Sequence, residues 1–363
     1  MERGGYPPRS FPVMKIALDA MGGDHAPGVN LEGARDFLAQ NPGVTELLLT
    51  GPTARLTTAA QAAGLTDPRV RLIEAPEVVG MEESGAKALR RKKNSSISVA
   101  ADLVKQGEAD ALVSAGNTGA AVAAATVKLR LLKGIQRAGI ASPMPNEFGV
   151  CNLLDAGANP EAKPAHLVAY AIMGSVYARE VLKVSDPKVG IMSNGEEEEK
   201  GTAFTKETLI LLKELVKSGN APFTLRGNVE GHDLFQTPLD VCLCDGFTGN
   251  IVLKSCEATA KAMSKWLKEE FKKNPMRMTG ALLGKRAFQA VKDRTNYESY
   301  GGSPLLGVNG VVIIAHGGSS AVAIKNALKM AAEALKHEVN PKIEEAIAKV
   351  PISTGPAIPA SLA

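Results

Sequence analysis

The feature that most constrains this chain is a regular alternation of short apolar runs with helical patterns. Each apolar run ends in a turn rich in Gly, Asp or Asn, and the runs are KIALDA, ELLLTG, ADALVSA, NLLDAGAN, KVGIMSNG, DVCLCDGFTGN and VVIIAHGGSS. Strands that alternate with helices in this way form right-handed βαβ units, and such units build a mostly parallel sheet. The sequence therefore predicts an α/β/α fold with helices on both faces of a mostly parallel sheet.

Composition agrees with this class of fold. Hydrophobic residues make up 45 % of the 363 residues and aromatic residues only 4 %, so Ala, Val, Ile and Leu must build the core. A membrane-spanning helix needs roughly 18 or more consecutive apolar residues, and we find no such run. The net charge of +4 does not indicate nucleic acid. Four cysteines in a chain without a signal peptide predict reduced thiols in a cytoplasm.

The two ends of the chain differ from its body. Residues 1–13 and 350–363 are rich in Pro and small residues and lack periodicity, so we expect a disordered extension and a disordered tail. We find no sharp linker and no fixed-period repeat between them. The body, 14–349, is predicted to be a single α/β/α catalytic domain with a helical excursion near 260–300, although a chain of this length also allows two closely packed lobes.

Four Gly-rich turns fall at the predicted carboxyl ends of strands, where open parallel sheets bind their ligands. Each turn is also compatible with an ordinary capped βα turn, but four on one predicted sheet edge indicate an anion site built from backbone N–H groups and short polar side chains. The candidate phosphate- or substrate-binding residues are Asp19, Gly22, Gly23, Ser114, Gly116, Asn117, Thr118, Gly119, Asp245, Thr248, Gly249, Asn250, His316 and Gly317.

Three further residues are candidates for catalysis. Asp24 and His25 supply a carboxylate and an imidazole beside the first Gly-rich turn. Lys200 follows the run Glu196–Glu199, which is typical of a solvated face. A lysine at this position can neutralise a phosphate or a developing oxyanion. For the histidines, a structural hydrogen bond at a turn is the alternative.

Two basic stretches suggest partners. Arg90, Arg91, Lys92 and Lys93 precede a Ser-capped helix and fit a solvated surface, a phosphate clamp or a dock for an acidic protein. Residues 272–294 interleave cations with apolar residues and contain one acidic residue, Asp293. Such a segment can lie on an anionic bilayer, and a helical excursion packed in an oligomer interface fits equally well.

Several motifs are missing from the sequence. There is no GxSxG elbow, no Walker lysine motif and no GxGxxG after the first strand-like run. A covalent acyl-enzyme therefore has little support, and the lack of a paired aspartate cluster disfavours an isocitrate-type dehydrogenase. Cys242 and Cys244 would share one face of a strand, but a second ligand pair for zinc is missing. We predict no metal and no cofactor.

A family resemblance covers about residues 14–340. The runs LDAMGGDHAP, RRKKNSS, SAGNTGA, LDAGAN, AYAIMGSVYA, GNVEGHDLF, CDGFTGNIVLKSCE and YGGSPLLGVNGVVIIAHGGSS resemble, in this order, the bacterial phosphate acyltransferases that convert acyl-[acyl carrier protein] to acyl phosphate. The resemblance implies a three-layer α/β/α Rossmann-like fold related to isocitrate dehydrogenases and phosphotransacetylases. It also implies a homodimer, a cytoplasmic enzyme of phospholipid synthesis that associates with the inner face of the cell membrane through 272–294, and a catalytic role for Lys200.

A mechanism follows as a hypothesis. Phosphate lies against the turns at Ser114–Ala120 and Asp245–Asn250, Lys200 or the basic run balances its charge, and one oxygen attacks the thioester directly. Positioning of this anionic nucleophile is the main task of the enzyme. His25 or His316 protonates the leaving thiolate. The acidic acyl carrier protein docks on residues 90–93, and no nucleic acid is expected. The rival functions are a phosphotransacetylase acting on short acyl-CoA, a dehydrogenase and a non-catalytic phosphate-binding scaffold.

Overall fold

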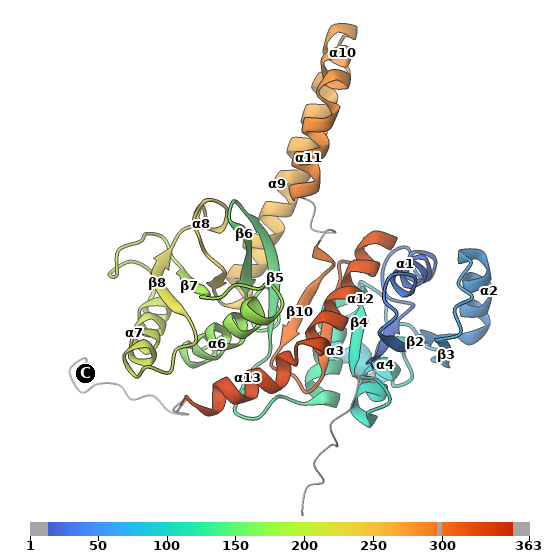
Figure 1. Ribbon diagram of the computed structural model, residues 1–363, viewed down its shortest axis with the longest axis horizontal. Coiled ribbons are helices and arrows are strands. Elements are labelled where there is room, and N and C mark those ends of the chain that lie inside the picture. Colours follow the sequence, from blue (N-terminus) through green and yellow to red (C-terminus); the bar gives the residue numbers. More distant parts are fainter. Residues whose placement is uncertain (1–13, 296–299, 351–363) are drawn as a thin grey trace, which may run out of the picture. The chain divides into compact units, whose positions relative to one another are not determined.

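The computed structural model describes residues 14–295 and 300–350, so the predicted extension 1–13 and almost all of the predicted tail lie outside the described residues. Contacts divide the chain into two compact units (Figure 1). Unit 1 comprises Met1–Arg130 and Gly310–Glu338, and unit 2 comprises Leu131–Asn309 and Val339–Ala363. A single catalytic domain over 14–349 stays a prediction.

Unit 1 follows the predicted alternation of strands and helices. Its sheet has the order β3-β2-β1-β4-β11, and every neighbouring pair is parallel. The elements are β1 (Met14–Asp19), α1 (Gly28–Leu38), β2 (Val44–Gly51), α2 (Thr53–Ala63), β3 (Val70–Glu74), α3 (Gly85–Arg91), α4 (Ser96–Gln106), β4 (Ala111–Ser114), α5 (Thr118–Ala124), a π-helix (Ala125–Leu129), β11 (Val311–Ile314) and α12 (Ala321–Lys336).

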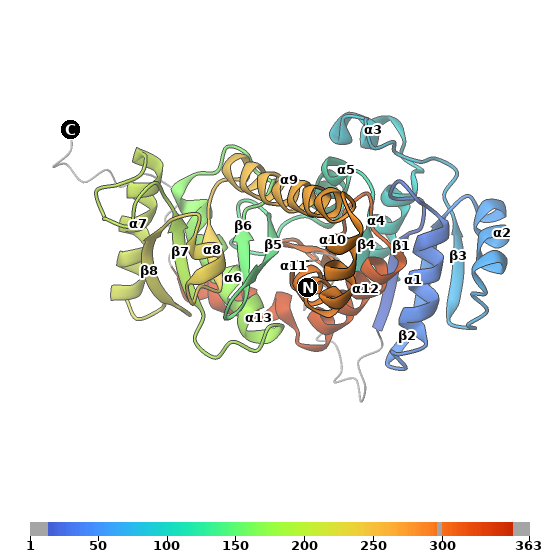
Figure 2. The same cartoon turned by 90° about the horizontal axis from the view of Figure 1, so that it is seen from above.

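The helices of unit 1 cover both faces of its sheet. The strands β1, β2 and β3 follow one another toward one edge of the sheet, whereas β4 is added on the other side of β1. Right-handed crossovers therefore place α4 on the opposite face from α1 and α2. Helix α12 packs beside α1 (Figure 2). A Cβ atom on Gly33 of α1 would lie 2.7 Å from the carbonyl oxygen of Ala321, so a glycine permits this close approach. Ile16, Ala17 and Leu18 of the central strand are fully buried, as the apolar run predicts.

Unit 2 combines an antiparallel hairpin with a parallel set of strands. The order of its strands is β10-β5-β6-β9-β7-β8, in which β10, β5 and β6 pair antiparallel while β6, β9, β7 and β8 pair parallel. The elements are β5 (Gly139–Asn146), β6 (Gly149–Leu154), α6 (Pro164–Glu180), β7 (Lys188–Met192), α7 (Ala203–Lys217), β8 (Thr224–Val229), α8 (Asp233–Gln236), β9 (Val241–Leu243), α9 (Gly246–Phe271), α10 (Pro275–Leu283), α11 (Lys285–Thr295), β10 (Ser303–Leu306) and α13 (Val339–Ala348).

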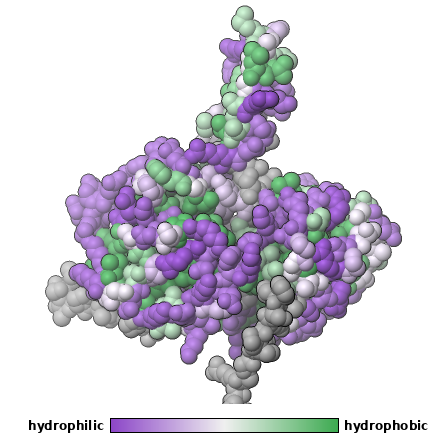
Figure 3. All heavy atoms as spheres, viewed as in Figure 1, coloured by the Kyte–Doolittle hydropathy of each residue, from purple (hydrophilic) through white to green (hydrophobic). Residues whose placement is uncertain are grey.

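Helices α9, α10 and α11 occupy the region expected as a helical excursion. The first turn of α9 is buried in unit 2 at Gly246 and Gly249, whereas α10 buries no residue. We call residues 256–295 the helical arm, and apolar atoms gather near its tip (Figure 3). Met276 and Leu283 of α10 are 85 % and 84 % exposed. Among the helices in the described ranges, none is both long enough and apolar enough to cross a membrane.

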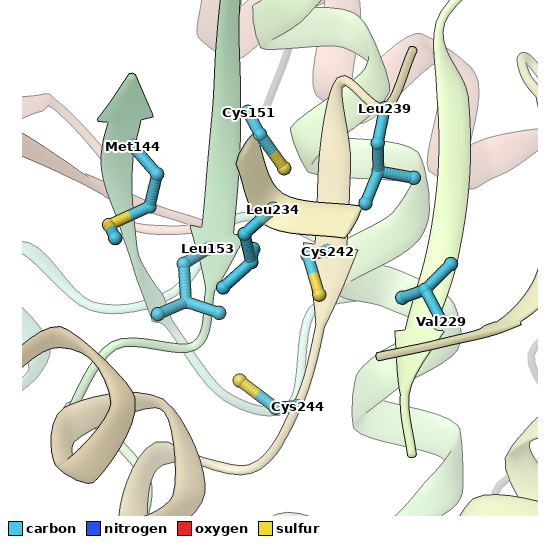
Figure 4. Packing of buried hydrophobic residues seen from close by; sticks show 8 residues of the cluster. All are labelled: Met144, Cys151, Leu153, Val229, Leu234, Leu239, Cys242 and Cys244. Carbon is cyan, nitrogen blue, oxygen red and sulfur yellow. The ribbon is translucent and has the colours of Figure 1, made fainter. Parts of the chain in front are cut away.

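The cysteines of unit 2 are part of its core. Cys151, Cys242 and Cys244 pack with Met144, Leu153, Val229, Leu234 and Leu239 (Figure 4). Burial raises the pKa of the Cys242 thiol to about 12 and also raises those of Cys151 and Cys244 well above the usual value. Neutral buried thiols behave as small apolar groups, so these residues fill space beneath the strand ends.

Candidate active site

Three of the predicted turns meet at one edge of the sheet in unit 1. They follow β1, β4 and β11, which are neighbouring parallel strands. The N–H group of Asp24 donates to the carbonyl oxygen of Gly317 at 2.8 Å, which joins the first turn to the last. A Cβ atom on Gly22 would lie 2.6 Å from the nitrogen of Gly116, so the first and second turns are in direct backbone contact. The structure thus brings together the unit 1 residues that the sequence singled out.

Asp19 and Ser114 lie beneath these turns. Both are almost fully buried. The Ser114 hydroxyl donates to Asp19 Oδ2 at 2.7 Å and accepts from the N–H group of Gly116 at 3.1 Å. Burial raises the pKa of Asp19, although hydrogen bonds from the hydroxyls of Ser96 and Ser114 lower it. The pair therefore supports the turn after β4 from below, and the N–H group of Gly116 is occupied by its hydrogen bond to Ser114.

The side chain of Asn117 also has structural partners. Its Oδ1 accepts from the N–H group of Ala120 at 3.0 Å and so caps α5. Its Nδ2 donates to the carbonyl oxygens of Gly80, Met81 and Glu83 at 3.2, 3.0 and 2.8 Å. The loop Gly80–Ser84 therefore belongs to this edge, and sequence reasoning missed it. The following residues, Thr118 and Gly119, are exposed.

His316 supplies a polar ring at the same edge. Its Nδ1 accepts a hydrogen bond from the N–H group of Gly318 at 3.0 Å, so a neutral ring carries its proton on Nε2. Asp24 and His25 are exposed on the first turn. Gly23 has φ +102°, a conformation that favours glycine, and a Cβ atom there would lie 2.9 Å from the carbonyl oxygen of Gly317. Hydrogen bonds within and between the turns thus fix this edge, and Asp24 and His25 remain exposed on it.

The basic run divides into two roles. Lys92 is partly buried; its Nζ donates to the carbonyl oxygen of Val78 at 2.8 Å and forms an ion pair with Glu83. Arg90, Arg91 and Lys93 are exposed. Lys92 therefore holds the chain before α3 in place, and the other three cations face solvent.

A second set of predicted residues lies in unit 2, at the start of α9. Asp245 caps this helix, because its carboxylate accepts from the N–H group and the hydroxyl of Thr248, both at 2.8 Å. A Cβ atom on Gly249 would lie 2.0 Å from the carbonyl oxygen of Asp155, so the helix start is pressed against the turn after β6. Asn250 is exposed beside Gly157 of that turn. Asp245 and Thr248 thus have local structural roles.

Asp155 organises this edge, and sequence reasoning did not select it. Its carboxylate accepts four backbone N–H groups, from Ile140, Gly157 and Ala158 on Oδ1 and from Asn159 on Oδ2, at 2.6–3.0 Å. These hydrogen bonds lower its pKa, but burial raises the pKa by more. The run LDAGAN carried the only signal, since Asp followed by Gly and Asn marks a turn whose carboxylate binds nearby N–H groups.

Lys200 lies in the loop between β7 and α7. Its side chain is exposed and its stem passes over Gly195. The loop is fixed by a hydrogen bond of 2.7 Å from Asn228 Nδ2 to the carbonyl oxygen of Glu197. The run of four glutamates is exposed, as expected for a solvated face. Lys200 and the α9 start therefore belong to unit 2, whereas the His316 edge belongs to unit 1.

One group of described residues has donors suited to a cation. Potential ligand atoms of Glu196, Glu230 and His232 all lie within 4.8 Å of one another at the surface. The imidazole of His232 also lies 3.7 Å from the carboxylate of Asp233. Exposed acidic groups commonly gather without a metal, so the absence of a metal site stays a prediction.

Comparisons with solved structures identify the fold. A phosphotransacetylase from Streptococcus pyogenes superimposes with a TM-score of 0.58 and 17 % sequence identity, covering 89 % of this chain and 94 % of that one. The EutD phosphotransacetylase from Staphylococcus aureus gives a TM-score of 0.55 with 16 % identity over 93 % of this chain and 94 % of that chain. The predicted phosphotransacetylase-like α/β fold is confirmed.

Comparisons of sequence identify the family. The family model described as "Fatty acid synthesis protein" matches residues 14–342. A protein named phosphate acyltransferase from Akkermansia muciniphila is 59 % identical over 337 residues, which are 93 % of this chain and 97 % of the relative. Another of that name from Geobacter sulfurreducens is 45 % identical over 92 % of this chain and 94 % of the relative. The chain therefore belongs to the fatty acid synthesis protein family, together with these phosphate acyltransferases.

Proposed function

We propose that this protein transfers a long-chain acyl group from acyl-[acyl carrier protein] to inorganic phosphate and releases acyl phosphate for phospholipid synthesis. The observation that carries the proposal is the 59 % identity to a phosphate acyltransferase over 97 % of that relative. The geometry of unit 1 supports it, because three Gly-rich turns meet at one sheet edge and helix α5 begins in one of them. That arrangement suits an oxyanion.

The proposed step is a direct displacement. Phosphate is held at the His316 edge of unit 1, and one of its oxygens attacks the thioester carbonyl carbon. A carbon–oxygen bond forms, the carbon–sulfur bond breaks, and the leaving thiolate takes a proton. His316 is proposed to help position phosphate through the turn after β11, and a neutral imidazole is a poor proton source. His25 is exposed, so it can take up a proton from solvent and pass it to the leaving thiolate, and it is the proposed acid.

Turnover of the two histidine variants separates these roles. Loss of a general acid typically costs about 10²–10⁴-fold, so we expect a drop of this size in kcat for His25→Ala. For His316→Ala we expect a lower kcat together with a higher KM for phosphate. The assay traps acyl phosphate with hydroxylamine and measures acyl hydroxamate. An unchanged kcat in His25→Ala would remove the acid role from this residue.

Lys200 is proposed to balance the negative charge of a substrate. Its position in the loop after β7, on the carboxyl edge of unit 2, supports this role, and its side chain is exposed to a ligand. Lys200→Met should lower kcat/KM for the acyl substrate without changing the melting temperature. Lys206→Met on the exposed surface of α7 is the matched control. Equal activity of the two variants would contradict the role.

A phosphotransacetylase acting on short acyl-CoA is the alternative function. The solved structures that share the fold favour this alternative, since two are phosphotransacetylases. The same hydroxamate assay separates the two functions, with palmitoyl-[acyl carrier protein] and acetyl-CoA as competing donors. Product from the carrier supports our proposal, and product from acetyl-CoA alone supports the alternative.

The acidic carrier is proposed to dock on α3 and the turn after it. Arg90, Arg91 and Lys93 are exposed there, whereas Lys92 is engaged with Glu83. Rim charges act mainly on association rate and salt dependence. Arg90→Glu with Arg91→Glu should raise KM for the carrier substrate and weaken its salt dependence, and Lys329→Glu on α12 is the control. Identical salt profiles would refute the docking site.

The helical arm is proposed to make two contacts, one with a second copy of the chain and one with the anionic inner face of the cell membrane, on which a cytoplasmic protein would lie. Exposed apolar residues and exposed cations along the arm support both contacts. Met276→Gln with Leu283→Gln should reduce sedimentation with anionic vesicles. Trp266→Gln should shift a dimer toward monomer in analytical ultracentrifugation. Unchanged sedimentation in either experiment contradicts the corresponding contact.

A further inference from the structure

Met81 is an apolar side chain placed among the polar groups of the unit 1 edge. It is 40 % exposed. Its terminal methyl group lies against Gly317, where a Cβ atom would be only 2.5 Å from it. Gly317 follows His316 in the turn after β11. An anion pocket needs no such methyl group, so Met81 calls for a separate explanation.

Asn117 holds the loop that carries Met81. All three hydrogen bonds from its Nδ2 end on this loop, at the carbonyl oxygens of Gly80, Met81 and Glu83. The Oδ1 of the same amide caps α5. One side chain therefore fixes the loop to the turn after β4, which is one of the predicted phosphate-binding turns.

A second set of contacts holds the loop from its other side. Glu83 Oε1 accepts from the N–H group of Gly80 at 2.7 Å and pairs with Lys92, whose Nζ also donates to the carbonyl oxygen of Val78. After the loop, a Cβ atom on Gly85 would lie 2.2 Å from the nitrogen of Ala120, so α3 starts in backbone contact with α5. The position of Met81 is therefore determined at both ends of its loop.

The chemistry of the proposed substrate explains an apolar group at this place. In the proposed reaction, the thioester carbonyl carbon must reach an oxygen of the bound phosphate, so the methylenes next to that carbonyl must pass close to the same turns. Methionine adapts to flexible apolar chains better than branched side chains do. We infer that Met81 is a specificity-determining residue that contacts the acyl chain of the thioester substrate. This inference rests on the proposed function and assigns the direction in which the chain leaves the phosphate.

Substitution at Met81 tests the inference through chain-length preference. Met81→Gln keeps the length of the side chain and makes its end polar, and Met81→Leu keeps it apolar. The assay compares palmitoyl and butanoyl groups on the same acyl carrier protein, so the carrier contact is constant. We expect Met81→Gln to lower the palmitoyl-to-butanoyl ratio of kcat/KM about tenfold, the lower end of what an apolar pocket discriminates. Met81→Leu should keep a ratio closer to the wild-type value than Met81→Gln does.

The controls separate this inference from the proposed function. Val127→Gln changes another exposed apolar residue of unit 1, in the π-helix, and should leave the ratio unchanged. If the wild-type protein makes acyl phosphate from the carrier and Met81→Gln keeps the wild-type ratio, the inference fails and the function stands. A loss that is equal for both acyl groups also overturns it. If the wild-type protein makes no acyl phosphate from the carrier, both fail together.

Discussion

A methyl group on Gly22 should separate the turns that build the unit 1 edge. A Cβ atom there would lie 2.6 Å from the nitrogen of Gly116, 2.8 Å from Asp19 Oδ2 and 3.0 Å from the Cα of Gly116. Ordinary contacts begin near 3.4 Å, so the backbones must move apart by about 0.8 Å. Because these neighbours are backbone atoms and a buried carboxylate, neither can rotate away.

The magnitude follows from that displacement. Overpacking of a tight site costs about 1–3 kcal/mol of stability. A misplacement near 1 Å at a reacting centre costs about 10²-fold in rate. We therefore expect Gly22→Ala to fold with a lower melting temperature, to raise KM for phosphate and to lower kcat/KM by about 10²-fold, because the turns that position phosphate are displaced from each other.

The assay is phosphate-dependent formation of acyl hydroxamate, with a thermal melt recorded on each variant. Gly28→Ala is the matched control, since it begins α1 after the same turn and nothing lies within 4 Å of a Cβ atom there. If Gly22→Ala retains the wild-type KM for phosphate while its melting temperature falls, the contact between the turns serves stability alone. The assignment of the phosphate site to this edge would then be wrong.

Three further predictions concern stability. Burial raises the pKa of Asp19 above 3.8, so the protonated side chain stabilises the folded state fully below that pH, and this stabilisation is lost as the pH rises through the folded-state pKa. The free energy of unfolding in urea should therefore fall less with rising pH in Asp19→Asn than in the wild type, and parallel pH profiles would contradict this. Asp155→Ala leaves four backbone N–H groups without their acceptor and should cost more than about 4 kcal/mol, whereas exposed Asp186→Ala should cost little; equal denaturant midpoints would refute this. Gly249→Ala should prevent soluble expression, because its methyl group would lie 2.0 Å from a carbonyl oxygen, while Gly280→Ala in α10 should express normally.

Local pattern was sufficient for seven of the described strands and for the residues at their ends, but it did not identify β3, β5, β8 and β10. An apolar run followed by Gly, Asp or Asn identifies a buried strand and its turn, because these residues allow the chain to leave the sheet and to cap the next helix. The turns at Asp19, Ser114, Asp245 and His316 were found in this way, and each follows a strand. The parallel order of β1, β4 and β11 then explains why three of those turns meet.

Partners distant in the sequence were decided by the tertiary structure alone. Asn117 binds a loop 34–37 residues away. Lys92 binds Val78 and Glu83, whereas the other cations of the basic run face solvent. The side chains of Asn117 and Lys92 carry no sign of these partners, because a hydrogen bond depends on where two segments meet in space. For the same reason, the sequence did not predict the structural role of Asp155 or the position of the loop that carries Met81. The residue types were evident from the sequence, whereas packing decided which of them hold the turns and which remain exposed to a ligand.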